Sequence, residues 1–143
     1  MSEFTASELS KILKEHKKWI DTDMKEGKHA DLHDANLSSA DLSGANLSLA
    51  HLSGANLSGA NLRKTNLSDA DLISADLSSA DLSRAKLSYA NLLCANLSGA
   101  NLSGAKLKKA NLTCASLRSA NLSGANLRRA TTCNTIMPDG TMQ

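Results

Sequence analysis

The sequence contains very few aromatic residues and very little proline. Its 143 residues include one phenylalanine, one tyrosine, one tryptophan and one proline. A core anchored on aromatic side chains is therefore excluded. No apolar run approaches the roughly 18 residues that a membrane-spanning helix needs, and the N-terminal residues lack the continuous apolar region of a secretion signal. We expect a cytoplasmic protein that does not interact with membranes.

The signatures of catalytic and cofactor sites are also missing. The sequence has no glycine-rich phosphate loop, no metal-binding motif, no nucleophile elbow and no pair of carboxylates at buried positions. Its three cysteines, Cys94, Cys114 and Cys133, follow no framework of secreted disulfide-rich proteins, and we expect free thiols. The sequence thus predicts a protein that is not an enzyme and has no cofactor and no metal ion.

What the sequence does contain is one five-residue unit, repeated about twenty times between Ala30 and Arg129. Leucine occupies every fifth position from Leu32 to Leu127, and alanine stands two residues before each leucine, with Thr65 as the exception. A period of five fits neither an α-helix nor a simple strand. The leucine and the alanine are two residues apart, so both side chains point to the same side of an extended chain. We expect each unit to be one short extended side followed by a bend, and several units to close one turn of a coil.

The units Ala30-Asp31-Leu32 and Ala35-Asn36-Leu37-Ser38, with their successors, resemble the A(D/N)LXX consensus of the pentapeptide-repeat protein family. The resemblance implies an all-β solenoid, a right-handed quadrilateral β-helix with four repeats in each coil. About five coils, stacked at roughly 4.8 Å, would form a rod. We expect residues 1–29 to form an N-terminal helix and cap, residues 30–130 the β-helix, and residues 131–143 a C-terminal capping segment.

The N-terminal helix has a recognisable start. Thr5 and Glu8 have the spacing of a capping box. We expect a helix from Phe4 to about Met24, with Gly27 as the terminator. Its apolar stripe, at helical spacing, comprises Leu9, Ile12, Leu13, His16 and Ile20. A basic amphipathic helix of this kind is either a membrane or partner anchor or a lid over the open end of the repeat core. We favour the lid, because the apolar stripe is narrow and acidic residues are mixed with the basic ones.

Charge is distributed unevenly along the repeat. Between Ala30 and Leu82, seven acidic and two basic residues give −5, whereas eight basic residues and one acidic residue from Ser83 onward give +7. Opposite charges at the two ends predict self-association through the ends, which salt would weaken.

Positions that recur every twenty residues should lie on one face of the coil, and this grouping collects cations on one side of the C-terminal coils. The face predicted for binding comprises Lys86, Lys106, Lys108, Lys109, Arg128 and Arg129. Lys64 and Arg84 should lie one above the other on its leading edge. This surface is either merely solvated or a docking site for an acidic partner.

A second candidate feature is apolar. Ile73 and Leu93 are twenty residues apart at a position that is usually serine, so they should stack as an exposed pair, with Tyr89 on the adjoining edge. Asp31, His51 and Asp71 should form a column on the same face. We expect this column to be a solvated charge ladder rather than a metal site, because a flat surface does not converge ligands on one point.

The function that these features favour is a rigid, non-catalytic protein-interaction or scaffold module with an unidentified protein partner. The alternative is a DNA-mimicking binder of DNA gyrase or topoisomerase that confers fluoroquinolone resistance, as the family resemblance suggests. That mimicry needs a long, predominantly negative surface, which the basic C-terminal half does not supply. We do not expect nucleic acid as a partner, because Tyr89 is the lone aromatic residue near the cations.

Overall fold

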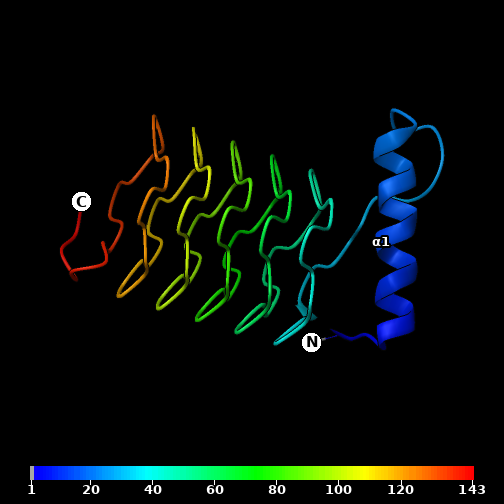
Figure 1. The fold of residues 1–143 in the computed structure, drawn as a ribbon, viewed down its shortest axis with the longest axis horizontal. Helices are drawn as coiled ribbons and strands as arrows, with labels where there is room; N and C mark the ends of the chain where they lie inside the picture. Colours follow the sequence, from blue (N-terminus) through cyan, green and yellow to red (C-terminus); the bar gives the residue numbers. More distant parts are fainter. Residues whose placement is uncertain (1) are drawn as a thin grey trace.

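The computed structural model describes residues 2–143 as one helix set against the end of a coiled solenoid (Figure 1). Its regular elements are strand β1 (Ser2–Glu3), helix α1 (Ala6–Asp21) and strand β2 (Ala35–Asn36). The coils after residue 30 carry isolated bridges instead of long strands. No helix within residues 2–143 has the length and apolar character needed to cross a bilayer.

The coils repeat every twenty residues, as the sequence predicts. Parallel bridges join each side to the same side of the next coil, from Asp31 and His51 to Ser116 and Ile136. Along each side, the leucine N–H donates to the next coil, for example from Leu52 to the carbonyl of Asp71 at 2.8 Å. The predicted fold, a right-handed quadrilateral β-helix with an N-terminal helix, is confirmed.

The corners of the coil are turns with one left-handed residue each. The N–H of Ala55 donates to the carbonyl of Leu52 at 3.1 Å, and Gly54 between them has a φ of +69°. A positive φ at the third turn residue is the conformation of a type II turn. Many corners place a residue other than glycine there, such as Lys64 at φ +56°. Corner side chains point outward, so this position can carry charge without disturbing the core.

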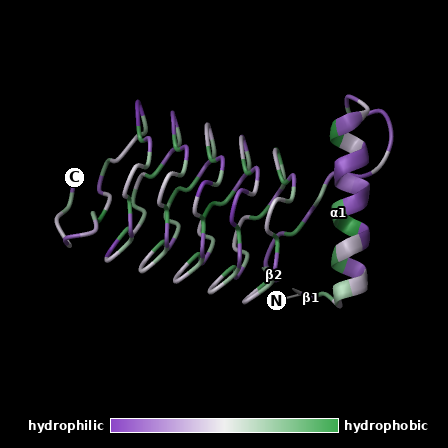
Figure 2. Ribbon diagram, in the orientation of Figure 1, coloured by the Kyte–Doolittle hydropathy of each residue, from purple (hydrophilic) through white to green (hydrophobic). Residues whose placement is uncertain are grey.

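The core consists of stacked leucine and alanine side chains. Every leucine of the register from Leu32 to Leu117 is at most 3% exposed. Figure 2 shows hydrophobic and hydrophilic residues alternating along the coils, which is the pattern that puts one set inside. Thr65, the exception in the alanine series, is fully buried, and its hydroxyl donates to the carbonyl of Leu42 at 2.8 Å. A buried hydroxyl with a partner costs little.

Helix α1 starts as predicted and ends earlier than predicted. Thr5 is the N-cap, and both hydrogen bonds of its capping box with Glu8 are present. The helix stops at Asp21 because the Thr22 hydroxyl donates to the Lys18 carbonyl at 2.7 Å, and the chain then turns through two residues with positive φ. Gly27 is therefore not the terminator.

Gly27 instead lets the chain fold back against α1. It has a φ of +81°, and a Cβ atom at this position would lie 2.3 Å from the carbonyl oxygen of Glu15. The next residue, Lys28, donates its N–H to the same Glu15 carbonyl at 3.2 Å. The return of the chain from α1 to the first coil thus depends on a residue without a side chain.

The cap covers the first coil with an apolar side and one histidine. Phe4, Leu9, Ile12 and Leu13 pack against the core. His16 is fully buried, and its ring is hydrogen-bonded to the backbone of the first coil. The amphipathic helix is used as a lid, which is the interpretation that we favour over an anchor.

The C-terminal end is covered in part. Ile136 bridges Met142, and Met137 packs against the core, but the Met142 side chain is 66% exposed. Leu122 and Leu127 are half-buried, unlike the leucines before them. Met142 therefore does not cover the end of the core, because the tail turns back along one part of it.

Candidate functional site

The predicted basic residues lie on three consecutive coils on one side of the solenoid. Lys86 bridges Lys106 directly, so two like charges occupy the same position of neighbouring coils. On the same side, the N–H of Lys109 donates to the carbonyl of Arg128 at 3.0 Å, which places Lys108 and Lys109 against the following coil. We use the name basic face for six cations: Lys86, Lys106, Lys108, Lys109, Arg128 and Arg129.

The basic face has no acidic partner within the described residues. All ion pairs in residues 2–143 fall between Lys17 and Asp71, that is, in the helix, the turn after it and the acidic N-terminal coils. Cations that stack at coil spacing repel one another, so the free protein carries an unfavourable local field. An acidic ligand would relieve that repulsion.

Tyr89 belongs to this surface. Its side chain is 52% exposed, and the Nζ atom of Lys109 lies 5.1 Å from the ring centroid. This separation is within the range of a cation–π contact, which stabilises an exposed pair modestly. The contact orients Lys109, which is half-buried, while Tyr89 stays exposed.

Lys64 and Arg84 occupy equivalent corners of neighbouring coils, one side before the basic face. Both have positive φ, both are exposed, and their N–H groups donate to Ser83 and Ser103 in the respective next coils. Their arrangement one above the other is as the twenty-residue grouping predicts. They extend the cationic surface around the corner.

Ile73 and Leu93 stack as predicted but are less accessible than predicted. The N–H of Ser74 donates to the carbonyl of Leu93 at 2.9 Å, so the two residues lie on adjacent coils. Both side chains are half-buried, whereas Leu49 and Tyr89 are exposed. The expectation of an exposed pair was wrong, because neighbouring side chains on a stacked face cover one another.

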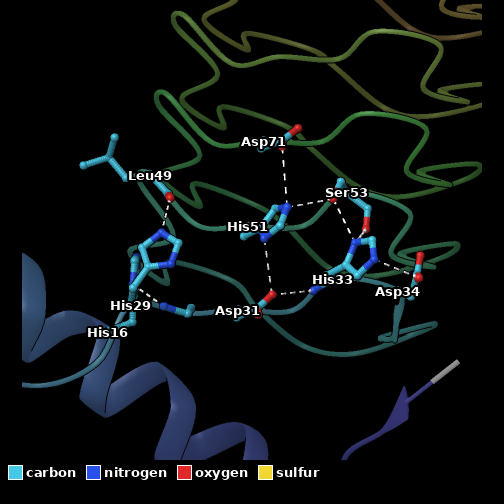
Figure 3. A network of polar contacts seen from close by, with 10 residues as sticks. His16, His29, Asp31, His33, Asp34, Leu49, His51, Ser53 and Asp71 are labelled. Atoms are coloured by element: carbon cyan, nitrogen blue, oxygen red, sulfur yellow. Dashed lines mark hydrogen bonds and ion pairs between the residues drawn. The ribbon is translucent and has the colours of Figure 1, made fainter.

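Asp31, His51 and Asp71 form the predicted column beside the cap (Figure 3). The His51 ring lies between the two carboxylates, with Nδ1 3.4 Å from Asp31 and Nε2 3.6 Å from Asp71. The Ser53 hydroxyl lies 2.9 Å from His51 and 3.0 Å from His33. Within residues 2–143, no group of three or more potential ligands converges on a metal position. The column is a ladder of polar contacts along the surface.

The three cysteines have exposed side chains and are free thiols. Cys94 and Cys114 occupy the same corner of neighbouring coils, with φ of +57° and +58°. Cys133 follows on the next coil, where its carbonyl accepts from the N–H of Cys114 at 2.9 Å. Parallel side chains at coil spacing explain why proximity alone does not make a disulfide.

Two features were not predicted from the sequence. The helical spacing places His16 on the apolar stripe of α1, and nothing in the pattern identifies its backbone partners. An open groove of about 800 Å³ lies between α1 and the first coil, and it depends on the angle at which the helix meets the coil. The signal that could have indicated His16 is a lone histidine among apolar residues at helical spacing.

Comparison with known proteins places the repeat in one family. The sequence matches pentapeptide repeats over residues 30–69, 65–104 and 95–131. None of the curated proteins compared with it matches. A solved structure that it resembles is alr5209, a pentapeptide repeat protein from Nostoc Pcc 7120, at 40% identity over 72% of this chain and 78% of that chain, with a TM-score of 0.60.

Two further solved structures match this chain over most of its length. HetL, a pentapeptide repeat protein involved in heterocyst differentiation regulation from the cyanobacterium Nostoc sp. strain PCC 7120, is 39% identical over 81% of this chain and 65% of its own, with a TM-score of 0.35. QnrB1, a plasmid-mediated fluoroquinolone resistance protein, is 24% identical over 75% of this chain and 62% of its own, with a TM-score of 0.36.

Proposed function

Since the chain belongs to the pentapeptide-repeat family, we propose that it is a rigid, non-catalytic module that binds an acidic protein surface through the basic face. The observation that carries this proposal is the segregation of charge. Six cations gather on one side of the C-terminal coils, and no carboxylate in residues 2–143 pairs with them. A solenoid keeps such charges at constant spacing, because each coil fixes the next.

The binding surface that we propose also includes the residues around the basic face. Lys64 and Arg84 widen the positive field around one corner, and Tyr89 supplies an exposed aromatic residue beside Lys109. Ile73 and Leu93 add a half-buried apolar margin on the neighbouring side. Aromatic residues and arginine are the types that contribute most at protein interfaces.

DNA mimicry at gyrase or topoisomerase is the less favoured function. It would require the negative potential of duplex DNA along the rod. Here the acidic character is confined to the N-terminal coils, and the residues from Ser83 onward include eight cations and one acid. A basic surface would repel rather than bind a site that accepts DNA.

Self-association through the oppositely charged ends is a subordinate proposal. Helix α1 covers the N-terminal end (Figure 1), so a head-to-tail contact would have to form beside the helix. Light scattering at low and high salt tests this contact, because screening weakens attraction between exposed charges. A monomer at every salt concentration would exclude it.

The basic face is tested by a quantitative pull-down from bacterial lysate with the variant Lys106→Glu/Lys108→Glu/Lys109→Glu. A matched control, Lys11→Glu/Lys25→Glu/Lys28→Glu, changes the net charge equally at exposed positions near the helix. We expect a partner that is retained by the wild type and the control and lost by the basic-face variant. Equal capture by all three proteins would contradict the proposal, and gyrase among the specific partners would favour the alternative.

A further inference from the structure

The N-terminal end of the solenoid has an unpaired edge. In the inner coils, the residue before each leucine forms two backbone hydrogen bonds with the preceding coil. For example, the N–H of Asn61 donates to the carbonyl of Ala40 at 2.9 Å, and the carbonyl of Asn61 accepts from the N–H of Leu42 at 2.8 Å. Residues 41–46, which we call the N-terminal rim, have no preceding coil. Within residues 2–143, the backbone N–H and carbonyl groups of Asp41 and Asn46 have no hydrogen-bond partner.

The neighbouring part of the same edge is already paired. β1 adds to β2 as a parallel strand, with Ser2 opposite Ala35 and Glu3 opposite Asn36. This pairing demonstrates that the edge of the first coil accepts a short parallel strand. The residues one coil before the rim, 21–26, cannot fill the remaining part, because they form the end of α1 and the turn after it.

A groove runs along the rim. It has a volume of about 800 Å³ and lies between α1 and the first coil, with Phe4, Leu9 and Leu13 on the helix side and Leu37 and Ala45 on the coil side. Ala40 and Ala45 are half-buried, whereas the alanines of the inner coils are fully buried. The lid therefore leaves apolar surface uncovered next to the unpaired backbone.

The charged groups at the mouth of the groove favour an acidic ligand. Lys14 and Lys17 line it from α1. Lys17 pairs with Asp21, whereas Lys14 has no ion pair within the described residues. The rim contributes Asp41, whose pKa is lowered by its hydrogen bonds from Ser43. An acidic group near Lys14 would be attracted, provided that it lies on the helix side.

We propose that the N-terminal rim binds an extended peptide of a partner protein as an added parallel strand. Its backbone pairs with Asp41 and Asn46, one aliphatic side chain enters the groove beside Leu13 and Ala45, and one acidic side chain lies against Lys14. This mode combines main-chain hydrogen bonds for affinity with a pocket for one side chain for specificity. It is independent of the basic face, which lies on other coils.

A helical partner does not fit the same observations. Helices satisfy their backbone groups internally, so a helix in the groove would leave the rim unpaired. An extended chain satisfies both the donors and the acceptors. A leucine-sized side chain suits a surface of leucine and alanine, as it does throughout the core.

The test uses a defined probe, the acetylated and amidated peptide Ala-Asn-Leu-Ser-Ser-Ala-Asp-Leu, which has the sequence of residues 35–42 and places its one aspartate away from Asp41. We expect it to bind with a dissociation constant below about 1 mM in a titration followed by NMR. The backbone amide signals of Asp41 and Asn46 should move, and their hydrogen exchange should slow. Lys14→Glu should weaken binding roughly fivefold, because it replaces an attraction by a repulsion.

Two controls separate strand addition from other binding. The first control is a pair of peptides with the same side chains, in which either the odd-numbered or the even-numbered backbone nitrogens are methylated. Each peptide can no longer donate hydrogen bonds along one of its two edges, and we expect one of the two to lose binding. The variant Lys106→Glu/Lys108→Glu/Lys109→Glu should bind the peptide as the wild type does. Three results would overturn the proposal: no binding at millimolar peptide, equal binding of both methylated forms, or loss of binding in the basic-face variant. Each result would do so independently of whether the basic face binds a partner.

Discussion

The Nδ1 atom of His16 accepts a hydrogen bond from the backbone N–H of Ala30 at 2.9 Å. The other ring nitrogen, Nε2, lies 2.8 Å from the carbonyl oxygen of Ser48, to which it donates. A ring that accepts at one nitrogen and donates at the other is neutral. In its neutral form, His16 thus connects α1 to two sides of the first coil through these hydrogen bonds.

This arrangement predicts a loss of stability at acidic pH. Burial is the main cause that lowers the pKa of His16 below its ordinary value of 6.5. The hydrogen bond to the Ser48 carbonyl raises this pKa, and the charge of His29 lowers it. The unfolded chain therefore binds this proton more readily than the folded chain does. The contribution of His16 is complete above about pH 6.5 and decreases as the pH falls towards the lowered pKa.

The measurement is the free energy of unfolding in urea at about pH 8 and about pH 5.5. We expect a smaller difference between the two values for His16→Gln, which cannot titrate, than for the wild type. Ser7→Gln, a change at an exposed position of α1 that does not titrate, serves as the control and should keep the wild-type difference. An unchanged pH dependence in His16→Gln would contradict the prediction.

Gly27 and Gly44 provide a matched pair for the return of the chain. Both have positive φ, but a Cβ atom on Gly27 would lie 2.3 Å from a backbone oxygen, whereas a Cβ atom on Gly44 meets nothing within 4 Å. We expect Gly44→Ala to cost about 1–2 kcal/mol through backbone strain alone. Gly27→Ala should cost about 3 kcal/mol or more, because α1 or the following turn must also shift. Equal losses in urea unfolding would show that the contact with α1 is unimportant.

Thr65 tests the value of a hydroxyl inside the core. Its donation to the Leu42 carbonyl is repeated by Thr135, which donates to the carbonyl of Leu112 at 2.6 Å. Thr65→Val keeps the shape and removes the hydrogen bond, so we expect a loss of about 1 kcal/mol. Thr113→Val, at a half-buried outward position, is the control and should change stability by less than about 0.5 kcal/mol. A gain in stability for Thr65→Val would mean that burying the hydroxyl costs more than its hydrogen bond contributes.

The repeat made most of the fold predictable, because one unit appears with the same spacing about twenty times. The local pattern and the coil geometry agree in every repeat. The core, the corners and the stacked cations of the basic face can therefore be predicted by grouping positions that recur every five and every twenty residues. The same counting placed Ile73 above Leu93. It did not predict their burial, which depends on the volume of the side chains around them.

The N-terminal end was less predictable, since it is not periodic. The stop of α1 at Asp21 depends on a hydroxyl of Thr22 and on a chain reversal against Glu15. Neither contact has a local sequence signature. The groove beside the rim depends on the tilt of the helix relative to the first coil, and tertiary packing sets that angle.

The arrangement of the cysteines predicts resistance to disulfide formation. Cys94 and Cys114 share a corner position and nearly the same φ, so their side chains run parallel at a coil spacing of roughly 4.8 Å. Disulfide-bonded cysteines have Cβ atoms about 3.5–4.5 Å apart and side chains that converge. We expect three thiols for each chain after equilibration in a glutathione buffer, measured by alkylation and intact mass.

Exposure makes the same three thiols reactive towards reagents. All three should be labelled by iodoacetamide in the folded state, and the urea midpoint of the labelled protein should stay close to that of the unlabelled one, because corner side chains point away from the core. The variant Cys94→Ser is the control for the number of labelled thiols, which should fall from three to two. A mass about 2 Da lower, protected from alkylation until a reductant is added, would show that the coils move far enough for the two sulfur atoms to bond.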